Sequence, residues 1–336
     1  MLKQEIYING YSSFNPVKDS GDSSDIFRCV EPDYKKYLDN GSVRRLGRIQ
    51  KMSMVAAKIC LDNADNVIPG AIITGTGLGC LEDTEKFLNN MLEDEKGTHS
   101  PTSFIQSTHN TVSGQIAIMV KCNGYNNTFS HRGLSFEVAL EDACLLLSEG
   151  QTDNVLVGAA DEMPENILKI TQKVHLFHSQ EDEKQPVSGE GVHFFLCSKT
   201  KKESSSVKLA GFDFAEGKQK FEDILLLCHK VLFTSGIEPE EIDAVILGTN
   251  PDSEEPHYQY LNDQLFSTAS ILNFKHLTGE SFTASGFSLI LGCQLLESKP
   301  VDERFFVRKN EKRIETVLIY NQFKGVSHSF FVLQRV

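Results

Sequence analysis

The sequence predicts an α/β fold with mainly parallel sheets, built from two related halves. Two observations carry this prediction: apolar strand-like runs alternate with helix-like stretches, and one pattern occurs twice along the chain. Alternation of strands and helices is typical of parallel sheets covered by helices. With 336 residues, the chain is long enough for a large core without disulfides or metal.

In the first part of the chain, EIYINGYSSF (5–14) predicts a strand. A helix is predicted over RRLGRIQKMSMVAAKICLDNA (44–64), where apolar residues recur at three- and four-residue spacings. GAIITGTGLG (70–79) predicts a buried strand that enters a glycine turn. The polar residues 93–103 predict a loop, and SGQIAIMVKCNG (113–124) predicts a helix that ends at Gly124.

The remaining elements follow the same alternation. KKESSS (201–206) is the predicted hinge between the halves. The other predicted elements, in chain order, are a helix over 134–149, a strand over 155–160, a charged loop over 179–188, strands over 191–198 and 207–214, a helix over 218–235, a strand over 244–250, a polar loop with a short helix, an apolar helix after 281–289, and two closing strands.

The repeated pattern indicates an internal duplication. TFSHRGLSF (128–136) and SFTASGFSL (281–289) superpose without a gap, and each precedes an apolar helix. AIITGTG (71–77) and AVILGTN (244–250) form a second matching pair. Repeats of this length indicate two structural copies. We therefore predict an N-terminal half over 1–203 and a C-terminal half over 204–336.

Composition excludes several classes of function. There are 33 Lys and Arg against 46 Asp and Glu, a net charge of −13, which argues against nucleic-acid binding and against docking on anionic membrane. Eight cysteines form no CxxC and mostly lie in apolar runs, which predicts reduced core thiols and a cytoplasmic protein. No secretory leader, membrane span or metal-ligating histidine motif is expected.

The segment NNTFSHRGLSF (126–136) is a candidate site for a nucleophile. It predicts a strand, a turn with Ser130 and His131, a glycine at Gly133, and then a helix. Several enzyme families mount a nucleophile on such a strand–turn–helix. Because adjacent side chains on a turn point apart, a Ser130–His131 dyad is the weaker interpretation of this pair.

Taken in order, the motifs resemble those of the β-ketoacyl synthases of the thiolase-like superfamily, which extend chains on acyl carrier protein. The resemblance covers nearly the whole chain and implies a five-layered α-β-α-β-α architecture of duplicated βαβαβ halves. The matching segments are GTGLG (75–79), GQIAIMVKCNG (114–124), LLSEGQTDNVLVGAADE (146–162), GEG (189–191), GTNPD (248–252), FKHLTGESFTASG (274–286) and NQFKGVSHSFFVL (321–333).

In that family the acyl chain is held on a cysteine at a helix N-terminus, where the helix dipole lowers the thiol pKa. Two histidines donate hydrogen bonds to the thioester oxygen, and a lysine supports one of them. By the resemblance, the nucleophile position is Ser130, and the histidine positions are Leu247 and Glu280. Lys275 matches the family lysine, so all the reacting groups except the lysine are replaced.

These replacements predict a chain without independent condensing activity. Serine without a base is nearly inert at pH 7, Leu247 has no donor, and an anionic Glu280 repels an enolate. The preferred interpretation of Lys275 and Glu280 is a structural ion pair that fills the emptied site.

The resemblance therefore implies a degenerate chain-length-factor subunit, which pairs with an active ketosynthase in type II polyketide or fatty-acid-like pigment synthesis. Aryl polyene, flexirubin or dialkylresorcinol pathways are examples. The complex would act on phosphopantetheine thioesters of acyl carrier protein, with no other cofactor. One alternative is a serine-dependent acyltransferase or condensing enzyme, with Ser130 as acyl carrier and His131 or Glu280 as base. The other is a homodimeric binding protein without a ketosynthase partner.

Overall fold

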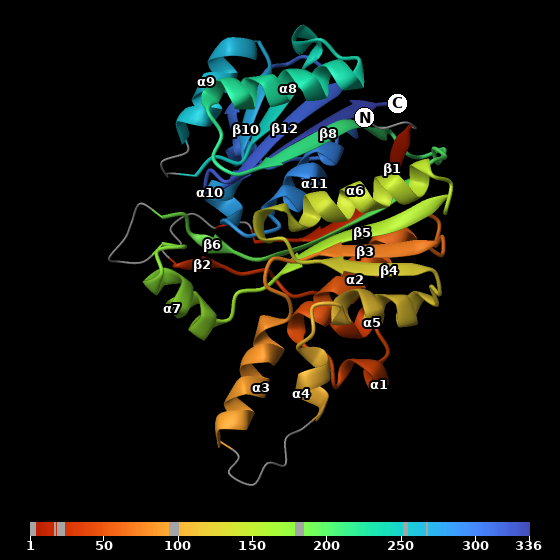
Figure 1. The fold of residues 1–336 in the computed structure, drawn as a ribbon. Helices are drawn as coiled ribbons and strands as arrows, with labels where there is room; N and C mark the ends of the chain where they lie inside the picture. The colour runs from red at the N-terminus through yellow and green to blue at the C-terminus, as the bar shows by residue number, and fades with distance from the viewer. Residues whose placement is uncertain are drawn as a thin grey trace.

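The computed structural model describes residues 5–16, 18, 24–93, 101–178, 185–250, 255–266 and 268–336. The predicted loops over 93–103, 179–188 and after 250 lie in part outside these residues. Figure 1 shows the two halves one above the other, with the ends of the chain close together at one side.

The strands are β1 (Ile6–Phe14), β2 (Ile26–Phe27), β3 (Ala71–Gly75), β4 (Tyr125–Phe129), β5 (Asn154–Asp161), β6 (Ser188–Gly189), β7 (Gly191–Ser198), β8 (Val207–Glu216), β9 (Ala244–Leu247), β10 (Ser270–Asn273), β11 (Phe306–Arg308), β12 (Thr316–Phe323) and β13 (Ser327–Arg335). The α-helices are α1 (Asn40–Val43), α2 (Arg48–Asp62), α3 (Leu81–Glu93), α4 (Pro101–Gln106), α5 (Thr111–Val120), α6 (Ser135–Ser148), α7 (Glu165–Lys173), α8 (Phe221–Ser235), α9 (Glu255–Leu265), α10 (Lys275–Thr278) and α11 (Ala284–Leu296). Short 3₁₀ turns are η1 (Tyr34–Lys36), η2 (Arg132–Leu134), η3 (Pro239–Glu241) and η4 (Glu303–Phe305).

Eleven of these strands form one sheet, and its order shows the duplication. The N-terminal half has the order β1-β7-β5-β3-β4, and the C-terminal half repeats it as β8-β13-β12-β9-β10, with β11 added at the edge. The two halves join where Ile6 and Tyr7 of β1 pair with Leu209 and Lys208 of β8. The predicted boundary at 203/204 falls in the segment between β7 and β8.

The sheet is mixed, so the expectation of mainly parallel strands was wrong in part. β3 pairs in parallel with β4 and β5, and β9 pairs in parallel with β10 and β12. The strands at the junction, β1, β7, β8 and β13, pair antiparallel. Antiparallel neighbours need no crossover helix, and a strand's apolar pattern alone does not reveal its direction.

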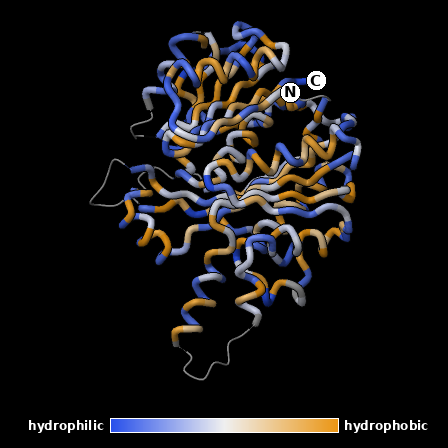
Figure 2. Tube along the Cα trace, viewed as in Figure 1, coloured by the Kyte–Doolittle hydropathy of each residue, from blue (hydrophilic) through white to orange (hydrophobic). Residues whose placement is uncertain are grey.

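Helices cover both outer faces and fill the centre, which gives the five layers that the sequence predicted. α2 and α5 pack on one face of the N-terminal half, and α8 and α9 pack on the outer face of the C-terminal half. α6 and α11 lie between the two halves of the sheet and form the central layer. Figure 2 shows apolar residues recurring along the strands of both halves.

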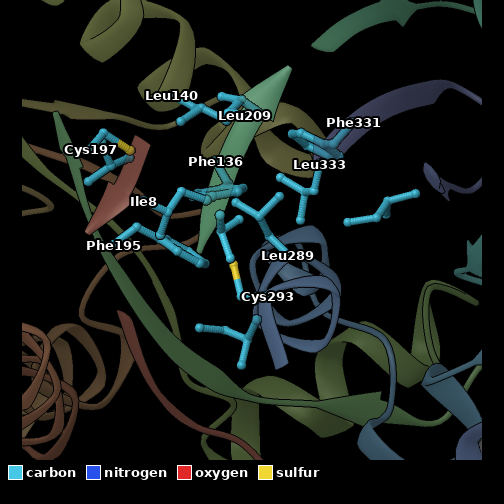
Figure 3. Close-up of a cluster of buried hydrophobic side chains, with 14 of the residues drawn as sticks. Ile8, Phe136, Leu140, Phe195, Cys197, Leu209, Leu289, Cys293, Phe331 and Leu333 are labelled. Carbon is cyan, nitrogen blue, oxygen red and sulfur yellow. The ribbon is translucent and has the colours of Figure 1, made fainter. Parts of the chain in front are cut away.

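The largest core cluster surrounds the two central helices. Figure 3 shows Phe136 and Leu140 of α6 and Leu289 and Cys293 of α11 gathered with side chains from both halves of the sheet. Phe136 packs against Phe195 and against Phe331, with ring centroids 5.6 and 6.3 Å apart. The helix pair therefore joins the halves into one core. The turn over residues 130–133, called here the nucleophile turn after the predicted role of Ser130, lies just before α6.

Several helix ends differ from the prediction by a few residues, and two of the differences have a clear physical cause. α5 ends at Val120 and not at Gly124, because Lys121 takes a left-handed conformation (φ 57°) and its N–H caps the helix. Gly124 is instead needed where the chain passes Gly70, whose carbonyl oxygen would lie 1.9 Å from an added Cβ. Residues 101–103, expected in a loop, begin α4, since proline suits the first turn of a helix.

All eight cysteines are buried and free, as predicted. None of the helices among the described residues is both long enough and apolar enough to cross a bilayer.

Candidate functional site

The nucleophile turn connects edge strand β4 to central helix α6. Ser130 is exposed, and its hydroxyl makes one long hydrogen bond of 3.4 Å to the carbonyl oxygen of Gly77. The Ser135 hydroxyl accepts from the His131 N–H at 2.9 Å and donates to the Arg132 carbonyl at 2.7 Å. Arg132 is left-handed, with φ 47°. Ser135 therefore fastens a tight elbow that presents Ser130 to solvent.

The imidazole of His131 does not face Ser130. Its Nε2 lies 3.0 Å from Oε2 of Glu216 on β8, and both side chains are about half exposed or more. No hydrogen bond between Ser130 and His131 is found among the described residues. Glu216 orients the ring as a surface ion pair would, so the geometry gives Ser130 no base at this turn.

Leu247, the first predicted histidine position, ends β9 inside an apolar cluster. It is 6% exposed and packs in the layer that contains Tyr258 and Tyr320. The next residue, Gly248, passes beside Lys275: a Cβ added to Gly248 would lie 3.2 Å from the lysine Nζ. The chain therefore reaches the predicted site at this point, but it brings an aliphatic side chain that faces the core.

Lys275 and Glu280 form the ion pair that the sequence predicted. Nζ of Lys275 lies 2.7 Å from Oε2 of Glu280, and the two side chains are 0% and 2% exposed. The ammonium also donates to the carbonyl of Gln322 at 2.8 Å, and the Asn250 side-chain amide donates to Glu280 Oε2 at 2.7 Å. A buried charge with a partner and added hydrogen bonds is stable, whereas one left alone is costly.

The backbone around Glu280 is held by the segment before β7. The Glu280 N–H donates to the Val187 carbonyl, and the Gly189 N–H donates to the Glu280 carbonyl, both at 2.8 Å. Gly279 has φ 76°, and an added Cβ would lie 2.7 Å from Gly189 backbone atoms. The glycines in both motifs are therefore required by close backbone approach.

Two phenylalanines connect the nucleophile turn to the ion-pair segment, and apart from the neighbouring glycines no sequence pattern predicts them. Phe282 and Phe323 contact one another with ring centroids 4.7 Å apart, and each is 6% exposed. An added Cβ at Gly77 would lie 2.2 Å from Phe282, and one at Gly133 would lie 2.7 Å from Phe323. Phe282 follows Glu280 by two residues, and Phe323 follows Gln322, whose carbonyl accepts from Lys275, so the chain leads directly from each ring to the buried pair.

Sequence reasoning also missed three buried carboxylates near these turns. Asp161 accepts from the Thr76 hydroxyl at 3.0 Å and the Gly77 N–H at 2.9 Å, and burial raises its pKa to about 6. Glu162 accepts from the N–H of Glu82, and burial raises its pKa to about 8. These contacts explain the Asp-Glu ending of β5: the first carboxylate holds the glycine turn, and the second caps the start of α3.

The third carboxylate is Glu137, in the first turn of α6. It is fully buried, accepts from the Ser329 hydroxyl at 2.8 Å, and burial raises its pKa to about 7. A carboxyl at the start of a helix is favoured by the dipole, which explains its place here.

Glu190, the acid of the GEG motif, has a structural partner. Its side chain is fully buried and receives two hydrogen bonds from the Arg48 guanidinium, at 2.6 and 2.9 Å. Its Oε1 also accepts from the N–H of Cys29 at 2.8 Å. Two nitrogens of a guanidinium group can donate to the two oxygens of one carboxylate at the same time. This bidentate pair fixes the start of α2 against the start of β7.

The family model for the N-terminal domain of beta-ketoacyl synthase matches residues 36–206, just over half of the chain. The chain belongs to the β-ketoacyl synthase family. The matched residues run from the end of η1 through the nucleophile turn to the residue before β8, so they contain Ser130 but not Leu247, Lys275 or Glu280. A search of curated proteins finds no match.

Solved structures of ketosynthases share the fold over almost the entire chain. The chain is similar to the ishigamide ketosynthase/chain length factor (TM-score 0.78, 13% identity, 99% of each chain covered). It is similar to a ketosynthase in complex with its chain length factor from Xenorhabdus doucetiae (0.79, 15%, covering 99% of this chain and 98% of that one). It is also similar to a beta-ketoacyl synthase from Burkholderia phymatum STM815 (0.77, 13%, covering 99% and 100%).

Proposed function

We propose that this chain is a non-condensing ketosynthase homologue that serves as the chain length factor of an active ketosynthase. The observation that carries the proposal is the state of Lys275: its ammonium is neutralised by Glu280 inside the protein, at 2.7 Å. Leu247 faces an apolar cluster at the other predicted histidine position. Among the described residues of this site, the Lys275 ammonium is committed to Glu280 and to the Gln322 carbonyl and is not left free for a thioester oxygen.

The chemistry of condensation argues for the same conclusion. An enolate needs preorganised donors, and loss of one such donor typically costs about 10²–10³ in rate. Glu280 accepts hydrogen bonds from Lys275 and Asn250 and offers the opposite charge. Ser130 has no base at its turn, because His131 bonds to Glu216. We therefore expect no chain extension by this subunit alone.

The surface supports a protein partner. β4 lies at the edge of the large sheet and pairs with β3 alone, so its other edge is open to a further strand. The nearby hairpin of α3 and α4 projects from the body and carries apolar residues (Figures 1 and 2). Its exposed large apolar side chains are Leu88, Met91, Leu92, Phe104 and Ile105. An open edge beside exposed apolar side chains favours association.

We propose that the partner is an intact ketosynthase with its cysteine and two histidines, and that the complex acts on acyl carrier protein thioesters in polyketide or fatty-acid-like synthesis. The eight buried free cysteines support a reducing compartment, the cytoplasm. A homodimer through the same surface is the competing assembly.

Co-expression with an intact ketosynthase from the same genome tests the proposal. A 1:1 complex is expected by pull-down and native mass spectrometry, and Ile105→Asp should weaken it by placing a charge on the apolar hairpin. Leu226→Asp is the matched control, since Leu226 is a similarly exposed aliphatic residue (69% against 58%) on α8. Recovery of the chain as a homodimer alone would argue against a chain length factor.

A serine-dependent acyltransferase is the second candidate, favoured by the exposed hydroxyl of Ser130. Intact-mass analysis after incubation with acyl and malonyl carrier proteins distinguishes the two. The proposed function predicts no acyl adduct on the chain. A stable adduct that is lost in Ser130→Ala would overturn it.

A further inference from the structure

Two adjacent clefts between α2 and α5 share Lys58 and Met119 in their linings and are together called here the α2–α5 groove. The larger cleft has a volume of about 320 Å³ and the smaller about 190 Å³. The apolar side chains of the larger cleft are Tyr37, Leu38, Val43, Leu46, Met54, Ile118 and Met119. Those of the smaller cleft are Leu61, Val67, Ile68, Met119 and Val120.

The groove has a buried floor and an apolar rim. Met54 and Leu61, on the floor, are each 5% exposed, whereas Ile118 and Ile68, at the mouth, are 73% and 63% exposed. Exposed large aliphatic side chains that cluster around a concave surface mark a binding site more often than scattered exposed apolar side chains do. Met54 and Met119 add flexible, polarisable walls that adapt to an alkyl chain.

Lys58 is the cation of this groove, and it lines both clefts. Its side chain is partly buried on α2. Among the described residues, no hydrogen bond or ion pair reaches its ammonium, although the exposed Asp39 and Asp62 also line the clefts. The aliphatic part of a lysine side chain can pack on an apolar wall while its ammonium stays at the surface. Such a site complements a ligand with an anionic head group and an aliphatic tail.

We propose that the α2–α5 groove binds a single-chain aliphatic carboxylate, with the carboxylate on Lys58 and the alkyl chain along the cleft that Met54 and Met119 line. This site lies on the opposite face of the N-terminal sheet from α6, apart from Lys275 and Glu280, and it does not depend on the proposed chain length factor role. The Lys58 ammonium selects the head group, with the exposed Asp39 and Asp62 pointing the net charge of the lining the other way, and the apolar lining holds the tail.

Displacement of a dansyl-labelled fatty acid by dodecanoate measures binding to the full chain, and the absence of tryptophan keeps the fluorescence background low. Below the micelle concentration, each methylene added from octanoate to dodecanoate should tighten binding about threefold to fourfold. Lys58→Met should weaken dodecanoate about tenfold and leave or improve the binding of dodecyltrimethylammonium. Lys35→Met, an exposed lysine outside the groove, should change neither ligand.

Three results would overturn the proposal. The first is an equal affinity of Lys58→Met and Lys35→Met for dodecanoate. The second is that Lys58→Met weakens the binding of dodecanoate and of dodecyltrimethylammonium equally. The third is that the chain sediments with phosphatidylglycerol vesicles but does not bind monomeric dodecanoate. The last result would make the groove a membrane contact. Met119→Glu provides a second variant, because it places a carboxylate in the groove at a partly exposed position and should abolish dodecanoate binding without loss of thermal stability.

Discussion

Replacement of Glu280 by glutamine tests whether the buried Lys275–Glu280 ion pair stabilises this part of the fold. Glutamine keeps the shape and an oxygen for the Asn250 amide, but it removes the carboxylate that directly contacts the buried Lys275 ammonium. Breaking a buried pair from one side typically costs about 3–5 kcal/mol. With both side chains at 2% exposure or less, little solvent screening is available to reduce that cost. We expect Glu280→Gln to lower the free energy of unfolding by that amount in urea titrations.

A double-mutant cycle and a surface control make the test specific. The double variant Lys275→Met, Glu280→Gln removes both charges. Its free energy of unfolding should exceed the value expected from adding the two single losses by about 3 kcal/mol. Glu303→Gln breaks the exposed Lys309–Glu303 pair, which has a similar distance of 2.6 Å, and should cost about 0–1 kcal/mol. If Glu280→Gln costs no more than Glu303→Gln, the ion pair does not stabilise the site and the reasoning fails.

Other measurements address the buried acids and the glycine contact. Burial raises the pKa of Glu162 to about 8 from an ordinary 4.5, so the folded chain holds a proton that the unfolded chain has released between these values. Stability should therefore fall as pH rises from about 5 to 8, by roughly 1.4 kcal/mol per pH unit from this group, and Glu162→Gln should remove that slope. Gly133→Ala should cost about 1–3 kcal/mol through its contact with Phe323, measured by urea unfolding; an unchanged midpoint would contradict the packing. Glu190→Gln should cost about 2–3 kcal/mol, because Arg48 is 19% exposed and so partly screened, and a loss below 0.5 kcal/mol would show that the pair contributes little.

The sequence predicted the parts of this fold that local patterns encode. The matching segments 71–77 and 244–250 become β3 and β9, which hold equivalent places between parallel neighbours in their halves. Lys275 and Glu280 are five residues apart around a glycine turn, so their pairing could be expected from short-range geometry. The roles of Ser130 and Leu247 as family positions stay predictions, since they rest on motif spacing.

What sequence reasoning missed depends on contacts between distant segments. Glu190 and Arg48 are 142 positions apart, and nothing in either local pattern names the partner. Phe282 and Phe323 come from different motifs and meet only when α11 and β12 pack together. Strand direction at the junction was misjudged for the same reason, because burial makes parallel and antiparallel strands equally apolar. Such pairings follow from tertiary packing, which one sequence does not specify.

The structure also bears on why the architecture around Lys275 and Glu280 is maintained. The carboxylates around the turns hold structural bonds: Asp161 fixes the glycine turn and Glu190 fixes α2. Glu280 supplies the buried counter-charge of the Lys275 ammonium. Replacing Lys275 alone would leave the Glu280 carboxylate buried without the ammonium that neutralises it. Replacing both residues together should therefore cost less stability than the two single replacements added. Retention of the lysine is therefore expected from stability alone and is not evidence of condensing chemistry.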